Sequence, residues 1–254
     1  MPFDFKKNLP PFVKNILFRF YDKWGAEIVL DKKMVRMLSE YCKLTAEEVI
    51  CMFKLAIKLD AYLWNVLNPK TKEEIENFYK ITSFNIFTLA YWHMSRYQRR
   101  FRKRVLNLCN GDVLDFGGGI GDMCIELKKK GIKNVTYADV GGKNFEFAAY
   151  MFRKNNHKIP MINLSKEKVD GRYDTILCID VIEHLTNPKE TLKEMVDRLN
   201  KNGILVITGL DCRGKSETHP WHFRGEPDVE RYLNSIGMMK SKDIEILWTK
   251  NQNV

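Results

Sequence analysis

Apolar residues in the first part of the chain recur at helical spacing. Between residues 31 and 92 they fall every three or four positions, with charged residues on the faces between them. Two capping boxes, at residues 45–48 and 71–74, mark where helices begin, and Asn68-Pro69 ends the helix between them. A break is expected near Thr82-Ser83. The pattern predicts several packed helices.

After residue 105 short apolar runs alternate with helical stretches. The run 173–180 is β-branched and aliphatic, which is typical of a strand buried on both faces. We expect strands at 113–116, 135–140, 159–164, 173–180, 204–208 and 244–249. We expect helices at 121–130, 145–152, 188–199 and 227–236. Gly131 is expected to end the first of these helices and Gly203 the third.

This alternation predicts an α/β fold with a doubly wound, mostly parallel, Rossmann-like sheet. The sheet has six or seven strands, because one convincing strand follows residue 236. The chain contains no internal repeat and no Gly/Ser-rich linker. We therefore divide it into an all-helical N-terminal cap, residues 1–104, and a Rossmann-like domain, residues 105–254, on which the cap docks.

Residues 11–24 repeat the helical spacing near the start of the chain. Phe12, Ile16 and Phe20 fall four positions apart, and Lys14 and Arg19 occupy other faces. One interpretation is an amphipathic helix packed on the protein's own core, which we favour. The other is a basic interfacial helix that makes peripheral contact with a membrane.

The stretch 112–122 joins a buried strand to a helix through a run of glycines. Glycines allow a ligand to lie against the backbone, and a strand, glycine turn and helix open a nucleotide-binding βαβ unit. The dinucleotide fingerprint is not matched, because position 122 is Asp. Asp115, just before the turn, would repel a pyrophosphate but suits the ammonium and sulfonium groups of S-adenosylmethionine. Asp139 ends the next strand, where a carboxylate would bind ribose hydroxyls.

These features resemble the class I S-adenosylmethionine-dependent methyltransferases over roughly residues 105–250. The hexapeptide 180–185, Asp-Val-Ile-Glu-His-Leu, is similar to the fourth-strand signature of small-molecule methyltransferases, including the ubiquinone-biosynthesis O-methyltransferases. The resemblance implies S-adenosylmethionine as cofactor. Asn163 stands where these enzymes often keep an Asp for the adenine amino group, and its amide oxygen can accept the same hydrogen bond.

Ligands of an open parallel sheet bind beyond the carboxyl ends of its strands, so the polar residues that end these strands should meet at one edge. The residues expected to bind the cofactor are Asp115, Gly117, Gly118, Gly119, Asp139, Val140, Asn163 and Asp180.

Three histidines are candidates for the catalytic base. Transfer of a methyl group to an alcohol or phenol requires removal of a proton, for which histidine has a suitable pKa. His184 lies in the hexapeptide, where it could equally orient the following helix. His219 and His222 lie in a long loop after the fifth strand, and long loops are often functional. With Asp211 and Glu183 this pair could also bind a divalent metal ion, but one histidine pair on a loop is insufficient, and we predict no metal.

Charge is unevenly distributed along the 254 residues. The formal net charge is +10, and residues 1–110 hold 20 Lys and Arg against 11 Asp and Glu, a net charge of +9. This asymmetry indicates an acidic partner, either an anionic small-molecule acceptor or, as the weaker expectation, nucleic acid. The basic run 96–104 could contact phosphates, but we favour a solvated helix whose Tyr97, Phe101 and Leu108 are buried.

The remaining composition predicts a cytoplasmic protein. The six cysteines form no C-x-x-C pair, which is typical of reduced thiols. No apolar run approaches the ~20 residues needed to span a bilayer, and the first residues lack the layout of a signal peptide. The sequence leaves the oligomeric state open.

Three functions compete at this point. The first is O- or N-methylation of a small molecule by in-line displacement. The second is methylation of RNA that is bound by the basic N-terminal region. The third is a non-catalytic methyltransferase-like binding protein. The hexapeptide 180–185 supports the first, because many nucleic-acid amino methyltransferases carry an Asn/Asp-Pro-Pro-aromatic motif there. The intact glycine turn argues against the third. We predict the first.

Overall fold

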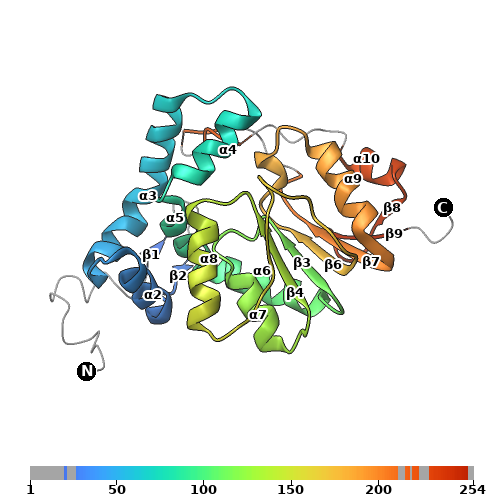
Figure 1. Ribbon diagram of the computed structural model, residues 1–254, viewed down its shortest axis with the longest axis horizontal. Coiled ribbons are helices and arrows are strands. Elements are labelled where there is room, and N and C mark those ends of the chain that lie inside the picture. Colours follow the sequence, from blue (N-terminus) through green and yellow to red (C-terminus); the bar gives the residue numbers. More distant parts are fainter. Residues whose placement is uncertain (1–19, 22–26, 211–214, 218, 223–228, 251–254) are drawn as a thin grey trace.

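The computed structural model of this chain describes residues 20–21, 27–210, 215–217, 219–222 and 229–250 (Figure 1). Seven strands form one sheet in the order β5-β4-β3-β6-β7-β9-β8, parallel except where β9 pairs with β7 and β8. The strands are β3 (Val113–Phe116), β4 (Val135–Asp139), β5 (Met161–Asn163), β6 (Tyr173–Cys178), β7 (Leu199–Ile207), β8 (Met238–Lys240) and β9 (Leu247–Lys250). The doubly wound, mostly parallel sheet is confirmed, with seven strands.

Helices cover both faces of the sheet because successive strand residues point to opposite sides. Val113 of β3 packs in a core with α6 (Arg96–Leu108), α7 (Asp122–Lys130) and α8 (Lys143–Lys154). Its neighbour Leu114 packs in a second core with α9 (Pro188–Arg198) and α10 (Val229–Ser235). Both faces of β3 are therefore buried, and the order of strands reverses between β3 and β6, which places the ligand crevice at their carboxyl ends.

In the part of the chain that the structure describes, four further helices precede α6, as the apolar spacing predicts: α2 (Lys32–Cys42), α3 (Ala46–Leu67), α4 (Lys72–Ile81) and α5 (Asn85–His93). Both capping boxes are confirmed, with Thr45 and Thr71 as the N-caps of α3 and α4. In Figure 1 these helices stand beside α8. The apolar core runs without interruption from α2 and α3 into α7 and α8, so the helical region is docked on the sheet domain.

The break between α4 and α5 is held by a buried acid. Asp60 of α3 accepts hydrogen bonds from the hydroxyls of Thr82, at 2.5 Å, and Thr88, at 3.3 Å. Burial raises the pKa of Asp60 to about 6, and these hydroxyls partly oppose the rise. The same contacts fix the direction of α5, which forms one wall of the site.

Three sequence predictions are wrong in detail. The N-terminal region is not all helical, because β1 (Phe20–Tyr21) and β2 (Glu27–Ile28) form an antiparallel pair where we expected a helix to run on to residue 24. Gly203 does not end a helix, because β7 already begins at Leu199, which pairs with Tyr173 of β6. Tyr97 of α6 is 57% exposed, and Arg102 is buried instead.

Some predictions fall outside the described residues. These predictions concern residues 11–19 and 22–24 of the segment 11–24, and residues 211–214, 218 and 223–225 of the loop 209–225, which include Asp211. They also concern residues 227–228 at the start of the helix 227–236. Within the described ranges, none of the helices combines the length and the hydropathy needed to cross a bilayer. The expected domain boundary at residues 104 and 105 falls inside α6 and stays a prediction.

Candidate active site

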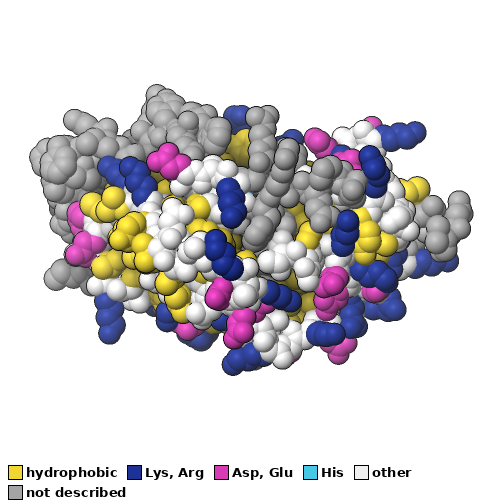
Figure 2. All heavy atoms as spheres, turned by 90° about the horizontal axis from the view of Figure 1, so that it is seen from above, with side chains coloured by type: hydrophobic (Ala, Val, Ile, Leu, Met, Phe, Trp, Pro, Cys, Tyr) yellow, Lys and Arg dark blue, Asp and Glu magenta, His cyan; other side chains and the backbone are white. Residues whose placement is uncertain are grey.

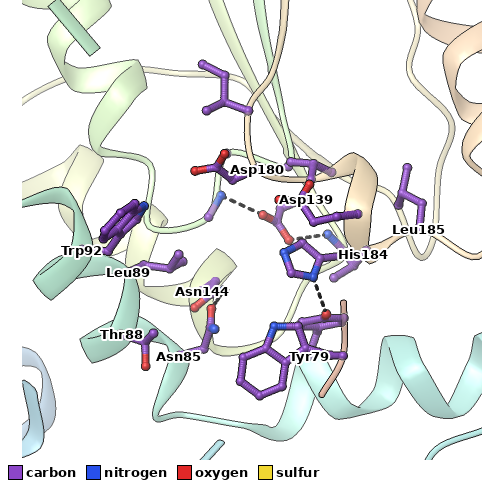
Figure 3. Close-up of a pocket in the computed structure, with 18 of the residues that line it drawn as sticks. Tyr79, Asn85, Thr88, Leu89, Trp92, Asp139, Asn144, Asp180, His184 and Leu185 are labelled. Atoms are coloured by element: carbon purple, nitrogen blue, oxygen red, sulfur yellow. Dashed lines mark hydrogen bonds between the residues drawn. The ribbon is translucent and has the colours of Figure 1, made fainter. Parts of the chain in front are cut away.

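A cavity of about 1490 Å³ lies at the carboxyl ends of β3, β4 and β6 (Figure 3). Its sheet side is polar and includes the glycine turn and the carboxylates of Asp115, Asp139 and Asp180. Helices α3 to α5 supply the opposite side, which is rich in apolar and aromatic residues: Phe53, Ile57, Ile75, Tyr79, Leu89, Tyr91 and Trp92. A polar floor thus faces an aromatic wall within one cavity.

The turn after β3 requires glycine. Gly117 and Gly119 have φ values of +70° and +54°, in the left-handed region that other residues rarely adopt. A Cβ on Gly117 would lie 2.4 Å from a methyl group of Val181, and one on Gly118 would lie 2.7 Å from the ring of Tyr137. The turn therefore brings bare backbone to the edge of the cavity, where a ligand can lie against it.

Asp139 is held in place by the backbone of this turn. Its carboxylate accepts a hydrogen bond from the Gly119 N–H at 2.8 Å and another from the Val140 N–H at 2.7 Å (Figure 3). Burial raises the pKa of Asp139 to about 6, although these two bonds favour the charged form. Each oxygen keeps a second lone pair, and Asp139 and Val140 both line the cavity, so the arrangement fits the ribose of a nucleoside.

Asp115 is buried at the end of β3. Only 5% of it is exposed, and it accepts a hydrogen bond from the Cys124 thiol at 3.2 Å. Burial raises its pKa to about 6. Because Asp115 borders the cavity, a cationic ligand group could approach this carboxylate, as the motif predicts.

Asp180 has a strained backbone. Its φ is +55°, which costs a non-glycine residue free energy and is common at functional sites. Thr208 supports this conformation: its hydroxyl accepts from the Asp180 N–H and donates to Asp180 Oδ1, both at 2.8 Å. Gln98 donates to the other carboxylate oxygen at 3.4 Å. Helix α6 and the residue that follows β7 thus orient Asp180 at the cavity.

Asn163 does not line the cavity as the sequence led us to expect. Its amide oxygen accepts a hydrogen bond from the Ser165 N–H at 3.1 Å, and the amide lies against Gly141. The neighbouring Leu164 borders the cavity instead. The amide of Asn163 is therefore used to hold the turn after β5.

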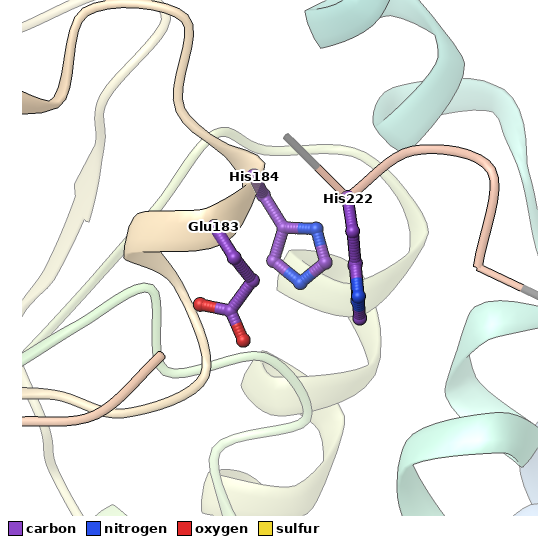
Figure 4. A group of neighbouring side chains, drawn as sticks. All are labelled: Glu183, His184 and His222. Carbon is purple, nitrogen blue, oxygen red and sulfur yellow. The ribbon is translucent and has the colours of Figure 1, made fainter. Parts of the chain in front are cut away.

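The three candidate histidines come together, and Figure 4 shows two of them, His184 and His222. The ring centroids of His184 and His222 are 4.8 Å apart, and those of His222 and His219 are 4.7 Å apart. His184 lies in the short helix η1 (Ile182–His184). Burial, aided by His222 and His219, lowers the pKa of His184 to about 3, and burial also lowers the pKa of His222. His184 is therefore neutral near pH 7 and can offer either a lone pair or an N–H.

Trp221 anchors the loop that carries His219 and His222. Its indole is 4% exposed and packs between Trp64 of α3 and Phe78 of α4, with ring centroids 6.2 Å from each. This contact explains how a loop after β7 reaches the helical wall. The aromatic residues of α3 and α4 thereby hold two histidines over the cavity.

Glu183, His184 and His222 are the described residues whose spacing could accommodate a metal ion. One ligand atom from each lies within 4.8 Å of the others (Figure 4). The set differs from the alternative considered on sequence grounds, because His219 is not part of it and Asp211 lies outside the described residues. Two imidazoles and a carboxylate are ligands that suit zinc.

Sequence reasoning missed a charged cluster at the cavity. Arg102 of α6 forms ion pairs with Asp122, at 3.0 Å, and Glu126, at 3.5 Å, and His93 approaches the same Asp122 oxygen to 2.9 Å. Burial opposes ionisation of Asp122, but Arg102 and His93 outweigh it and lower the pKa of that carboxyl. Arg102, Asp122 and His93 all line the cavity. The available signal was Asp122 itself, an acid where the dinucleotide fingerprint has its third glycine.

Comparisons with known proteins show the family of this chain. The family described as "Methyltransferase domain" matches residues 91–243, more than half of the chain. A ubiquinone biosynthesis O-methyltransferase of Rickettsia akari is 32% identical over 107 residues, 41% of this chain and 42% of that protein. A second, of Rickettsia typhi, is 33% identical over 106 residues, 41% of this chain and 43% of that protein. The match thus spans less than half the length of these curated relatives.

Among solved structures, the magnesium protoporphyrin IX methyltransferase of Synechocystis with bound S-adenosylmethionine has a TM-score of 0.48 and 16% identity. The alignment covers 88% of this chain and 99% of that chain. The family match includes the glycine turn, Asp139 and the hexapeptide 180–185, the motifs that carry the resemblance. The chain therefore belongs to the methyltransferase-domain family, within the class I S-adenosylmethionine-dependent methyltransferases.

Proposed function

We propose that this protein transfers a methyl group from S-adenosylmethionine to a small-molecule acceptor bound in the same cavity. The observation that carries this proposal is the cavity itself, in which a glycine turn and an anchored Asp139 face an aromatic wall. When bound, S-adenosylmethionine supplies an electrophilic methyl group. The relatives named as O-methyltransferases support oxygen as the accepting atom.

In this proposal the sheet side binds the cofactor. The backbone at Gly117, Gly118 and Gly119 approaches the nucleoside closely, and Asp139 binds its ribose. Asp115 and Asp180 place negative charge near the cationic end, and Val140 lies beside the ribose site. Asn163 contributes by shaping the turn after β5 and not by direct contact.

The helical side positions the acceptor. Its aromatic residues exclude water and restrict the acceptor to a small range of orientations, which is most of what an in-line displacement demands of a protein. His184, His219 and His222 lie where they can orient the attacking oxygen and receive its proton. Lys54, Lys58 and Lys72 also border the cavity and support an anionic acceptor.

The geometry weakens the RNA alternative. Within the basic run 96–104, Arg102 is buried in ion pairs, and the guanidinium of Arg99 donates to the Val29 carbonyl at 2.7 Å. On the face drawn in Figure 2, Lys and Arg side chains are scattered among acidic and apolar ones.

The domain roles and the location belong to the same proposal. Residues 1–104 act as a docked cap that supplies most of the acceptor wall, and residues 105–254 bind the cofactor. A cytoplasmic location is supported by the thiols, since Cys42, Cys51, Cys109, Cys124 and Cys178 are unbridged.

Calorimetry and a radiolabel assay test the proposal. We expect the purified protein to bind S-adenosylmethionine and S-adenosylhomocysteine, and to transfer labelled methyl to one or more members of a panel of phenols, catechols and carboxylated phenols. Absence of S-adenosylmethionine binding would refute the cofactor site. Methylation of RNA in preference to the panel would reverse the substrate class.

A further inference from the structure

Asn144, in the first turn of α8, connects the sheet domain to the helical cap. Its side-chain NH₂ group donates a hydrogen bond to the side-chain oxygen of Asn85, the first residue of α5, at 2.8 Å. Both residues line the cavity (Figure 3). Helix α8 follows β4 closely, so Asn144 comes shortly after Asp139 and Val140 in the chain. Asn144 thus stands between the cofactor side of the cavity and the cap.

The start of α8 is packed tightly against the cap. Gly142, which precedes the helix, has a φ of +78°, and a Cβ at this position would lie 2.3 Å from the Cα of Lys80 near the end of α4. Two backbone segments are therefore in direct contact, and a backbone cannot rotate away as a side chain can. Asn144, two positions later, has a fixed place relative to the cap.

The orientation of both amides follows from Asp60. Its carboxylate accepts a hydrogen bond from the side chain of Asn85, in addition to those from Thr82 and Thr88. With a pKa of about 6 this carboxylate is ionised near pH 7 and can only accept, so Asn85 turns its NH₂ group toward Asp60 and its oxygen toward Asn144. Asn144 must then meet that oxygen with its own NH₂ group, because two amide oxygens would repel each other.

The amide oxygen of Asn144 is left without a donor. Asn144 is 8% exposed, and its Oδ1 is buried and has no hydrogen-bond partner among the described residues. A buried acceptor without a donor costs about 1–3 kcal/mol, and native structures contain few of them. Since Asn144 borders the cavity, a molecule bound there can supply the missing donor.

We propose that Asn144 is a binding residue whose Oδ1 accepts a hydrogen bond from a neutral hydroxyl or amino group of a ligand in the cavity. The inference rests on the proposed methyl transfer and deepens it. Two ligands of that reaction carry such a donor, the nucleoside of the cofactor and the hydroxylated acceptor. A neutral amide oxygen suits either of them, and binding measurements distinguish the two.

Calorimetry on Asn144→Ala provides the first test. If the donor is on the cofactor, the affinity for S-adenosylhomocysteine should fall about 3- to 10-fold, the effect of one lost neutral hydrogen bond. If it is on the acceptor, that affinity should stay unchanged, and the affinity for catechol in the presence of S-adenosylhomocysteine should fall by the same factor. The matched control is Asn134→Ala, which also removes an amide that donates one hydrogen bond, to Asp112 at 2.7 Å, away from the cavity.

Unchanged affinity for both ligands in Asn144→Ala would overturn the inference and leave the proposed function standing. Failure of the wild type to bind S-adenosylhomocysteine would refute the proposed function and this inference together.

Carbon NMR of the wild type provides a second test that requires no variant. The Asn144 Cγ resonance, assigned through its bonds to the backbone, should move downfield on saturation with S-adenosylhomocysteine or on the further addition of catechol. The reason is that a hydrogen bond to the oxygen polarises the C=O group. A resonance that stays in place with both ligands bound would overturn the inference, even if Asn144→Ala proved too unstable to measure.

Discussion

Replacement of Gly117 by alanine tests the glycine turn most directly. Alanine at a φ of +70° costs about 1–2 kcal/mol, because its Cβ approaches the following carbonyl. The added Cβ would also lie 2.4 Å, 2.9 Å and 3.3 Å from three carbons of the Val181 side chain. Since the whole branched group is in the way, rotation of Val181 cannot relieve the overlap, which adds about 1–3 kcal/mol.

Gly131 supplies a matched control. It ends α7 with a φ of +98°, and nothing lies within 4 Å of the position of an added Cβ. Gly131→Ala therefore carries the backbone strain without the collision. We expect the free energy of unfolding to fall by about 1–2 kcal/mol in Gly131→Ala and by about 2–5 kcal/mol in Gly117→Ala, measured by urea denaturation.

Cofactor affinity separates stability from function in these two variants. Gly117→Ala should weaken S-adenosylhomocysteine binding by about tenfold or more, because the backbone must move away from Val181 and this backbone borders the cavity. Gly131→Ala should bind it as the wild type does. Equal stability losses in both variants would show that the overlap with Val181 is relieved. Wild-type affinity in Gly117→Ala would show that this turn does not hold the cofactor.

Three further changes probe the rest of the site. Asp139→Asn should weaken S-adenosylmethionine binding by about 1–3 kcal/mol in calorimetry, because one amide oxygen cannot replace the two acceptor oxygens of the carboxylate. In the wild type, the affinity for S-adenosylmethionine should fall as the pH drops through about 6 and the carboxylate of Asp139 gains a proton. An affinity that does not change with pH in this range would contradict the assignment. Trp221→Ala should cost about 3–5 kcal/mol of stability and lower turnover, whereas a loss below about 1 kcal/mol would mean that the indole is not an anchor. His222→Ala should reduce turnover about 10²- to 10⁴-fold with cofactor affinity intact, and turnover near wild type would exclude it as the base.

Local signals in the sequence predicted most of the secondary structure and, apart from Asn163, the expected residues on the sheet side of the cavity. The caps at Thr45 and Thr71 act within one helical turn, so they can be identified from residues three positions apart. The glycine turn and Asp139 follow from a strand–turn–helix unit about 30 residues long. Short-range rules sufficed because each of these features is stabilised by residues close to it in the chain.

Tertiary packing decided the acceptor side. Tyr79 meets His184, and Trp221 enters the cluster of Trp64 and Phe78, only because the helical cap docks beside the sheet. The burial of Arg102 likewise depends on Asp122 and Glu126 of another helix. Before docking, an aromatic or basic residue on an amphipathic helix has the same pattern whether it faces solvent, core or ligand, because periodicity specifies a face of the helix and not what that face contacts.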